Sequence, residues 1–132
     1  MKWKVQPGYK YTRQHEWAGR EGNLVSVGIT DYAQDMLKEI VYVELPAVGR
    51  LLKAGEVFAL IESAKALSER CSPVAGAVVA INEALINQPE LLNQAPYSGG
   101  WMIRIEVEAG YENPDLLTDE EYCALLREES AR

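Results

Sequence analysis

Residues 55–76 read GEVFALIESAKALSERCSPVAG. An apolar run at 57–61 follows a glycine, and small residues flank the lysine at position 65. These signals favour a strand, a turn and a second strand, with Lys65 protruding from the tip of the hairpin. On this evidence alone Lys65 is read as a solvated turn residue, because most exposed lysines have no specific role.

The same strand pattern recurs on both sides of this hairpin. Short apolar runs bounded by Gly, Pro and Asn occupy 24–29, 40–45, 77–81 and 101–107. Together with the hairpin they predict at least five strands with short connections. The segment 82–100 holds too many turn residues for a long helix, so we expect a loop there, with one helical turn around Leu91 and Leu92.

Two helices are expected between and after these strands. Thr30 is placed to cap a short helix that crosses between two strands. Thr118 and Glu121 form a capping-box pattern, which predicts a C-terminal helix over about 118–129. The acidic residues at 119–121 then belong to the start of a helix rather than to a dedicated binding tail. We expect residues 1–132 to form one domain.

Composition excludes several classes of function. The chain of 132 residues has 13 Lys and Arg against 20 Asp and Glu, a formal net charge of −7, which disfavours nucleic acid and anionic membranes as partners. The single histidine argues against most metal sites and catalytic triads, so we expect neither a metal site nor a self-sufficient enzyme.

The sequence also bears on the compartment. No apolar stretch has the length of a membrane span, and the first residues lack the apolar region of a signal peptide. The two cysteines, Cys71 and Cys123, form no CxxC motif and suit a reducing compartment. We therefore expect a cytoplasmic protein of prokaryotic type, and favour this over a mature mitochondrial matrix form.

Several separated pieces of the chain match one family in the same order. Inside the hairpin they are ESAKA at 62–66 and SPVAG at 72–76. Outside it they include HEW at 15–17, VGIT at 27–30, VELP at 43–46, NEAL at 82–85 and GW at 100–101. One short match would be a weak signal, but this ordered set, over about residues 9–126, resembles the glycine cleavage system H protein family.

The resemblance implies a mainly β fold, a flattened β sandwich (barrel-sandwich hybrid) of the lipoyl/biotinyl type with short helices and a C-terminal helix. It also implies that lipoic acid is covalently attached to Lys65 through an amide, which removes the positive charge of this lysine. The protein would supply position and the cofactor reactivity, so the resemblance implies a carrier with no catalytic residue of its own.

The family further implies a set of partner enzymes. The arm accepts an aminomethyl group from a pyridoxal-phosphate glycine decarboxylase and yields it to a tetrahydrofolate-dependent aminomethyltransferase. Dihydrolipoyl dehydrogenase then reoxidises the arm, and lipoate-attaching enzymes install it. Since a carrier must present one free face to several enzymes in turn, we expect a monomer.

Two acids are candidates for contacting the arm. A loaded arm would carry a cationic amine, which a nearby carboxylate could hold and shield from water. Glu16 in the His-Glu-Trp match is the first candidate, with a surface strand acid as the alternative. Glu69 is the second, at a position where the family more often has Asp. We interpret His15 as a packing or hydrogen-bonding residue and Cys71 as an inert strand cysteine.

Departures from the family pattern cluster around Lys65. Leu67 replaces a small residue, and Arg70 stands where an aliphatic residue is usual. These changes leave two alternatives open: a related lipoyl carrier serving lipoyl relay or sulfur oxidation, and an unmodified acidic β domain for protein interaction. A biotin carrier is disfavoured, because biotinyl hairpins typically place Met on both sides of the lysine, where this chain has Ala64 and Ala66.

Overall fold

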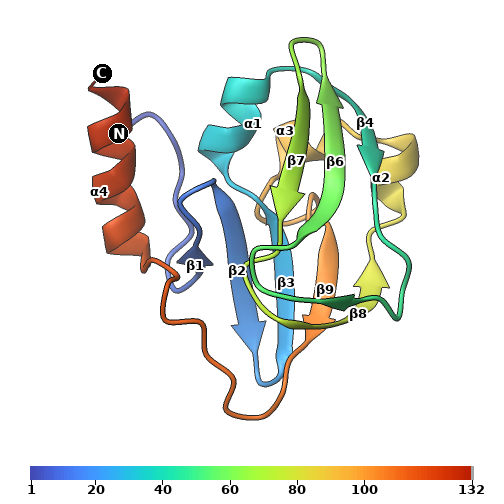
Figure 1. Cartoon of the computed structure of the whole chain (residues 1–132). Coiled ribbons are helices and arrows are strands. Elements are labelled where there is room, and N and C mark those ends of the chain that lie inside the picture. Colours follow the sequence, from blue (N-terminus) through green and yellow to red (C-terminus); the bar gives the residue numbers. More distant parts are fainter. Residues whose placement is uncertain (132) are drawn as a thin grey trace.

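The computed structural model describes residues 1–131 and shows two antiparallel sheets (Figure 1). The larger sheet has the order β1 (Lys10–Tyr11), β2 (Glu16–Glu21), β3 (Leu24–Ile29), β9 (Ile103–Glu106), β8 (Gly76–Ile81) and β5 (Leu51–Leu52). The smaller sheet has the order β4 (Ile40–Glu44), β6 (Val57–Ser63) and β7 (Leu67–Cys71). The mainly β fold class is therefore confirmed.

The helices are α1 (Asp31–Leu37), α2 (Ala84–Asn87), α3 (Leu91–Gln94) and α4 (Asp119–Ser130). Both expected caps are present: the Thr30 hydroxyl accepts from a backbone N–H of α1, and Thr118 and Glu121 form the capping box of α4. The expected single turn at Leu91 is α3, and α2 is an addition to it. Leu85 of α2 is fully buried, and this tertiary packing outweighs the turn signals around it. None of the helices in residues 1–131 has the length and apolarity of a membrane span.

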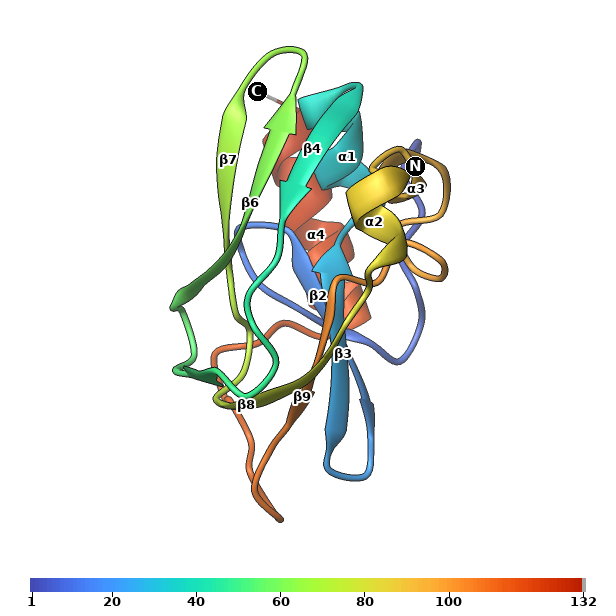
Figure 2. The ribbon, with the colours of Figure 1, turned by 90° about the vertical axis from the view of Figure 1, so that its right-hand side faces the viewer.

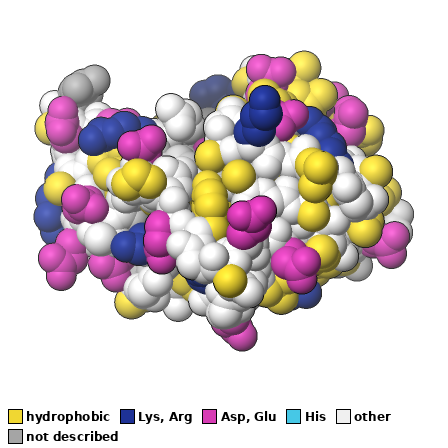
Figure 3. Space-filling model, turned by 60° about the horizontal axis from the view of Figure 1, so that its bottom comes forward, with side chains coloured by type: hydrophobic (Ala, Val, Ile, Leu, Met, Phe, Trp, Pro, Cys, Tyr) yellow, Lys and Arg dark blue, Asp and Glu magenta, His cyan; other side chains and the backbone are white. Residues whose placement is uncertain are grey.

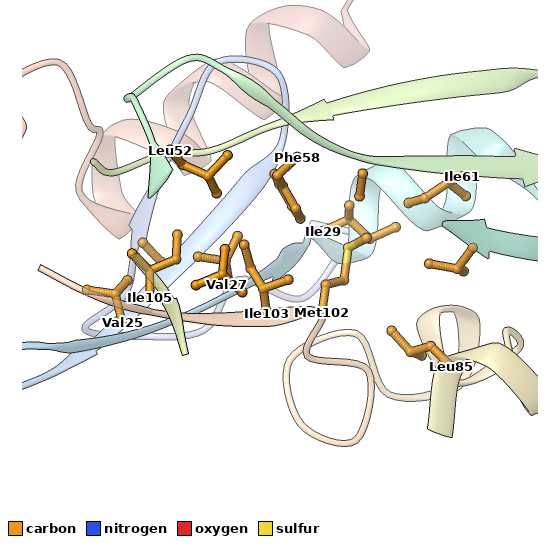
Figure 4. Packing of buried hydrophobic residues seen from close by; sticks show 14 of the residues in the cluster. Val25, Val27, Ile29, Leu52, Phe58, Ile61, Leu85, Met102, Ile103 and Ile105 are labelled. Carbon is orange, nitrogen blue, oxygen red and sulfur yellow. The ribbon is translucent and has the colours of Figure 1, made fainter. Parts of the chain in front are cut away.

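The main core lies between the two sheets. Alternate residues of β3 and β9 point inward, among them Val27 and Ile103, and they face Phe58 and Ile61 of β6 (Figure 4). Leu85 closes the end of this core from α2. Burial of every second residue is typical of strands with one face against a core, and in β3 and β9 small or polar residues lie between the inward-facing ones.

A second buried cluster fixes the C-terminal helix. The rings of Tyr11 and Tyr122 stack with centroids 4.4 Å apart and an interplanar angle of 5°. Trp17 and Leu126 complete the cluster, which joins β1, β2 and α4. In Figure 1 the helix stands beside β1, at the outer side of the larger sheet.

The β6–β7 hairpin extends past the rest of the smaller sheet (Figure 2). Its last paired residues are Glu62 and Leu67, so residues 64–66 form the tip. The architecture thus places this tip at the end of two paired strands that are anchored in the core.

Candidate functional site

The backbone of the hairpin tip is fixed by Ser63. Its N–H donates to the carbonyl of Ala66 at 2.8 Å, and its hydroxyl oxygen accepts from the N–H groups of Lys65 at 3.2 Å and Ala66 at 3.1 Å. On the other side, the N–H of Ala64 donates to the carbonyl of Glu39 at 2.9 Å, which ties the tip to the segment before β4. The turn is therefore held from two directions.

Lys65 is exposed at this tip, as the sequence predicts. Among the described residues, no hydrogen bond or ion pair engages its amine. The amine is therefore accessible from solvent, while the backbone that carries it is held in place.

The solvent-facing side of the smaller sheet, here called the outer face, is acidic and apolar. Two cross-strand rows form it: Tyr42, Glu62 and Leu67 beside the tip, and Glu44, Leu60 and Glu69 below them. The side chains of Tyr42 and Leu67 are 51% and 66% exposed. Neither row contains a basic residue. The surface seen from below shows acidic side chains scattered among apolar ones, together with some Lys and Arg (Figure 3).

Glu16, the first candidate for contacting the arm, is only 1% exposed, so the alternative of a surface acid is wrong. Its carboxylate accepts from the Thr12 hydroxyl at 2.6 Å, Nη2 of Arg70 at 2.6 Å and the Cys71 N–H at 3.4 Å. Arg70 also donates to the hydroxyl of Ser68 and the carbonyl of Gln14. A role for Glu16 as an arm contact stays a prediction, but its carboxylate already has an internal cationic partner.

Glu69, the second candidate, is exposed on the outer face. It lies two residues beyond Leu67, the first residue of β7, a rise of about 7 Å along the strand. Among the described residues it has no ion pair. Its role also stays a prediction, but its carboxylate is free to meet a group arriving from solvent.

A pocket of about 700 Å³ lies on the other side of the hairpin's base. Glu16, Cys71 and Ser72 line one side of it, and the loop after Asn113 lines another. Burial, followed by the charge of Glu16, raises the pKa of the Cys71 thiol. The thiol therefore stays protonated at neutral pH, which supports its interpretation as an unreactive strand cysteine.

His15 is a hydrogen-bonding residue in the structure. Its Nδ1 lies 2.8 Å from the hydroxyl of Tyr122, which in turn lies 2.7 Å from the hydroxyl of Thr30. Its Nε2 lies 3.0 Å from the Glu129 carboxylate. Since Tyr122 and Glu129 belong to α4, His15 ties the start of β2 to the C-terminal helix. Burial lowers the pKa of His15 and outweighs the opposing effect of Glu129.

Acidification is therefore expected to destabilise the fold through His15. Because the pKa is lower in the folded state, the unfolded chain binds the proton more readily, and the stabilisation is present above pH ~6.5 and lost as the pH falls. Urea unfolding at pH 7.5 and at pH 5.5 should show a larger loss of stability for the wild type than for His15→Gln. Equal losses in the two proteins would show that His15 does not carry this dependence.

The architecture is that of a lipoyl-domain-like β sandwich in which a hairpin turn presents an exposed lysine. The family model described as glycine cleavage H-protein matches residues 9–129, and the chain belongs to this family. It is 48% identical over 125 residues to the glycine cleavage system H protein of Carboxydothermus hydrogenoformans, covering 95% of this chain and 96% of the relative. It is 50% identical over 119 residues to that of Rubrobacter xylanophilus, covering 90% and 92%.

A solved structure extends the comparison to the fold. The crystal structure of a glycine cleavage system H protein from Mycobacterium marinum matches with a TM-score of 0.84 and 32% identity, over 93% of this chain and 99% of that one. The resemblance drawn from the sequence is therefore confirmed at the level of family and fold.

Proposed function

We propose that this chain is the lipoyl carrier of a glycine cleavage system, with Lys65 as the attachment point. The observation that carries the proposal is an exposed amine, unpaired within residues 1–131, on a turn whose backbone Ser63 holds in place. When bound through an amide, the lipoyl group would supply thiol and disulfide chemistry at the end of a long tether. The chain itself would present and orient that tether and would have no catalytic site.

The charge and the apolar side chains of the outer face suit several enzyme partners that bind one after another. Counting Lys65 with Glu44, Glu62 and Glu69, the local formal charge is 1 − 3 = −2, and amide formation at Lys65 would change it to −3. The exposed Tyr42 and the other apolar side chains add contact area. Such a face suits partners with basic residues around an apolar centre, since complementary charge speeds association.

We propose that these partners are the pyridoxal-phosphate glycine decarboxylase, the tetrahydrofolate-dependent aminomethyltransferase, dihydrolipoyl dehydrogenase and the lipoate-attaching enzymes. A monomer would meet each of them in turn through the outer face. The bacterial origin of the relatives and the two free cysteines support a place in the cytoplasm.

A second candidate function is a lipoyl carrier with other partners, in lipoyl relay or sulfur oxidation. The observation that favours it is Leu67, which is 66% exposed beside the tip, where the partner enzymes would make contact. A large apolar side chain at this place changes the surface that a partner reads.

A two-stage reconstitution tests the proposal. The purified chain is first incubated with a lipoate–protein ligase, lipoate and ATP, and intact mass is expected to show one lipoyl group per chain. The lipoylated chain is then mixed with glycine decarboxylase, and exchange of the glycine carboxyl with labelled bicarbonate is expected, with none for the unmodified chain. Lipoylation without exchange would favour the second candidate, and no lipoylation would favour the unmodified interaction domain.

A further inference from the structure

The Glu16 carboxylate stands in the wall of the 700 Å³ pocket, but its capacity to accept hydrogen bonds is largely used. A carboxylate offers about four acceptor positions. Thr12 occupies one on Oε1, while Arg70 and the Cys71 N–H both donate to Oε2. About one position is left for a ligand in the pocket.

Arg70 is also held where it is. Its side chain is 9% exposed, and it donates to Ser68 and to the carbonyl of Gln14 as well as to Glu16. Its Nε is buried and has no hydrogen-bond partner among the described residues. Within those residues, Glu16 is the only ionic partner of Arg70. A guanidinium keeps its charge at any physiological pH, so the pair has a net charge of −1 + 1 = 0, with Glu16 in the pocket lining and Arg70 beside it.

At Glu16, an ammonium group entering the pocket therefore meets the carboxylate of a neutral ion pair, whereas Asp115 and Glu121 are further acids of the pocket lining. To bind Glu16 fully it would have to displace a guanidinium at 2.6 Å, which would leave the buried charge of Arg70 uncompensated. We propose that Arg70 is a specificity-determining residue, because its ion pair with Glu16 prevents this carboxylate from binding cationic groups. Under the proposed function, on which this consequence rests, the amine of a loaded arm is left to accessible acids such as Glu69.

This effect of Arg70 is testable on the unmodified chain, with methylammonium chloride as the probe. The reporter is the backbone N–H of Cys71, which donates to Glu16, followed by ¹⁵N–¹H correlation spectra at constant ionic strength. The wild type is expected to show no saturable shift that Glu16→Gln removes, and any shift that persists in Glu16→Gln is assigned to Asp115 or Glu121 of the same pocket. Arg70→Met and Arg70→Gln, which remove the charge, are expected to bind methylammonium at least about tenfold more tightly than the wild type. The double variant Arg70→Met with Glu16→Gln is expected to lose this binding.

Two results of this titration would overturn the proposal. Saturable binding to the wild type that Glu16→Gln removes would overturn the proposal, whatever the variants do. A folded Arg70→Met or Arg70→Gln that still fails to bind methylammonium would overturn it as well. Using two neutral replacements protects the test against one that does not fold, and the spectra report folding directly. Because no lipoyl group is involved, failure of Lys65 to be acylated would count against the proposed function and leave this result unaffected.

Discussion

Lys65→Arg is expected to abolish acylation by a lipoate–protein ligase completely, with no lipoyl group detected by intact mass. Amide formation needs a primary amine that can lose a proton, and the guanidinium of arginine stays protonated. The fold should be unaffected, because the side chain is exposed and the backbone N–H at 65 still donates to Ser63. We expect the free energy of unfolding to change by no more than about 0.5 kcal/mol.

Lys53→Arg is the matched control. Lys53 is also exposed, in the connection between β5 and β6, and its replacement should leave acylation complete. If the Lys65→Arg protein still gains one lipoyl group, the attachment point lies elsewhere in the chain, and the proposed site is wrong. If both variants lose acylation, the effect is not specific to the hairpin tip.

The hairpin could be predicted from the sequence because the signals that specify it are local. The apolar run of β6 is continuous, small residues flank Lys65, and Ser63 supplies the hydrogen bonds within residues 63–66, while the bond from Ala64 to Glu39 adds a contact outside the turn. Exposure of Lys65 follows from that turn alone. The α4 helix was predictable for the same reason, since Thr118 and Glu121 lie three residues apart and cap the helix together.

The environment of Glu16 could not be predicted from the sequence, because it depends on contacts between residues that are far apart in the chain. β2 reads EWAGRE, with no apolar run, and is a strand because β1 and β3 pair with it. Burial of Glu16 depends on Arg70, which belongs to the other sheet. One signal in the sequence could have indicated the pair. In a strand, Ser68, Arg70 and Ser72 point to the side opposite Glu69, and Glu69 is exposed. Arg70 therefore points inward, and a buried guanidinium requires an acidic partner.

This pair is expected to dominate the stability of the hairpin's base. Glu16→Gln leaves a buried guanidinium without a counter-charge, and Arg70→Met leaves a buried carboxylate without one. Each single change is expected to cost about 3 kcal/mol of unfolding free energy, because both side chains are less than a tenth exposed and solvent screens them little.

The double variant, Glu16→Gln with Arg70→Met, is expected to cost clearly less than the sum of the two single changes, since it leaves neither charge unpaired. Urea unfolding of the four proteins measures the difference. The exposed pair Arg50 and Glu56, at 3.2 Å, is the matched control, and Glu56→Gln should change stability little because solvent screens that contact. If the costs at 16 and 70 simply add, within about 0.5 kcal/mol, the two charges are not coupled. In that case Arg70 could not be what closes Glu16 to a cation in the pocket.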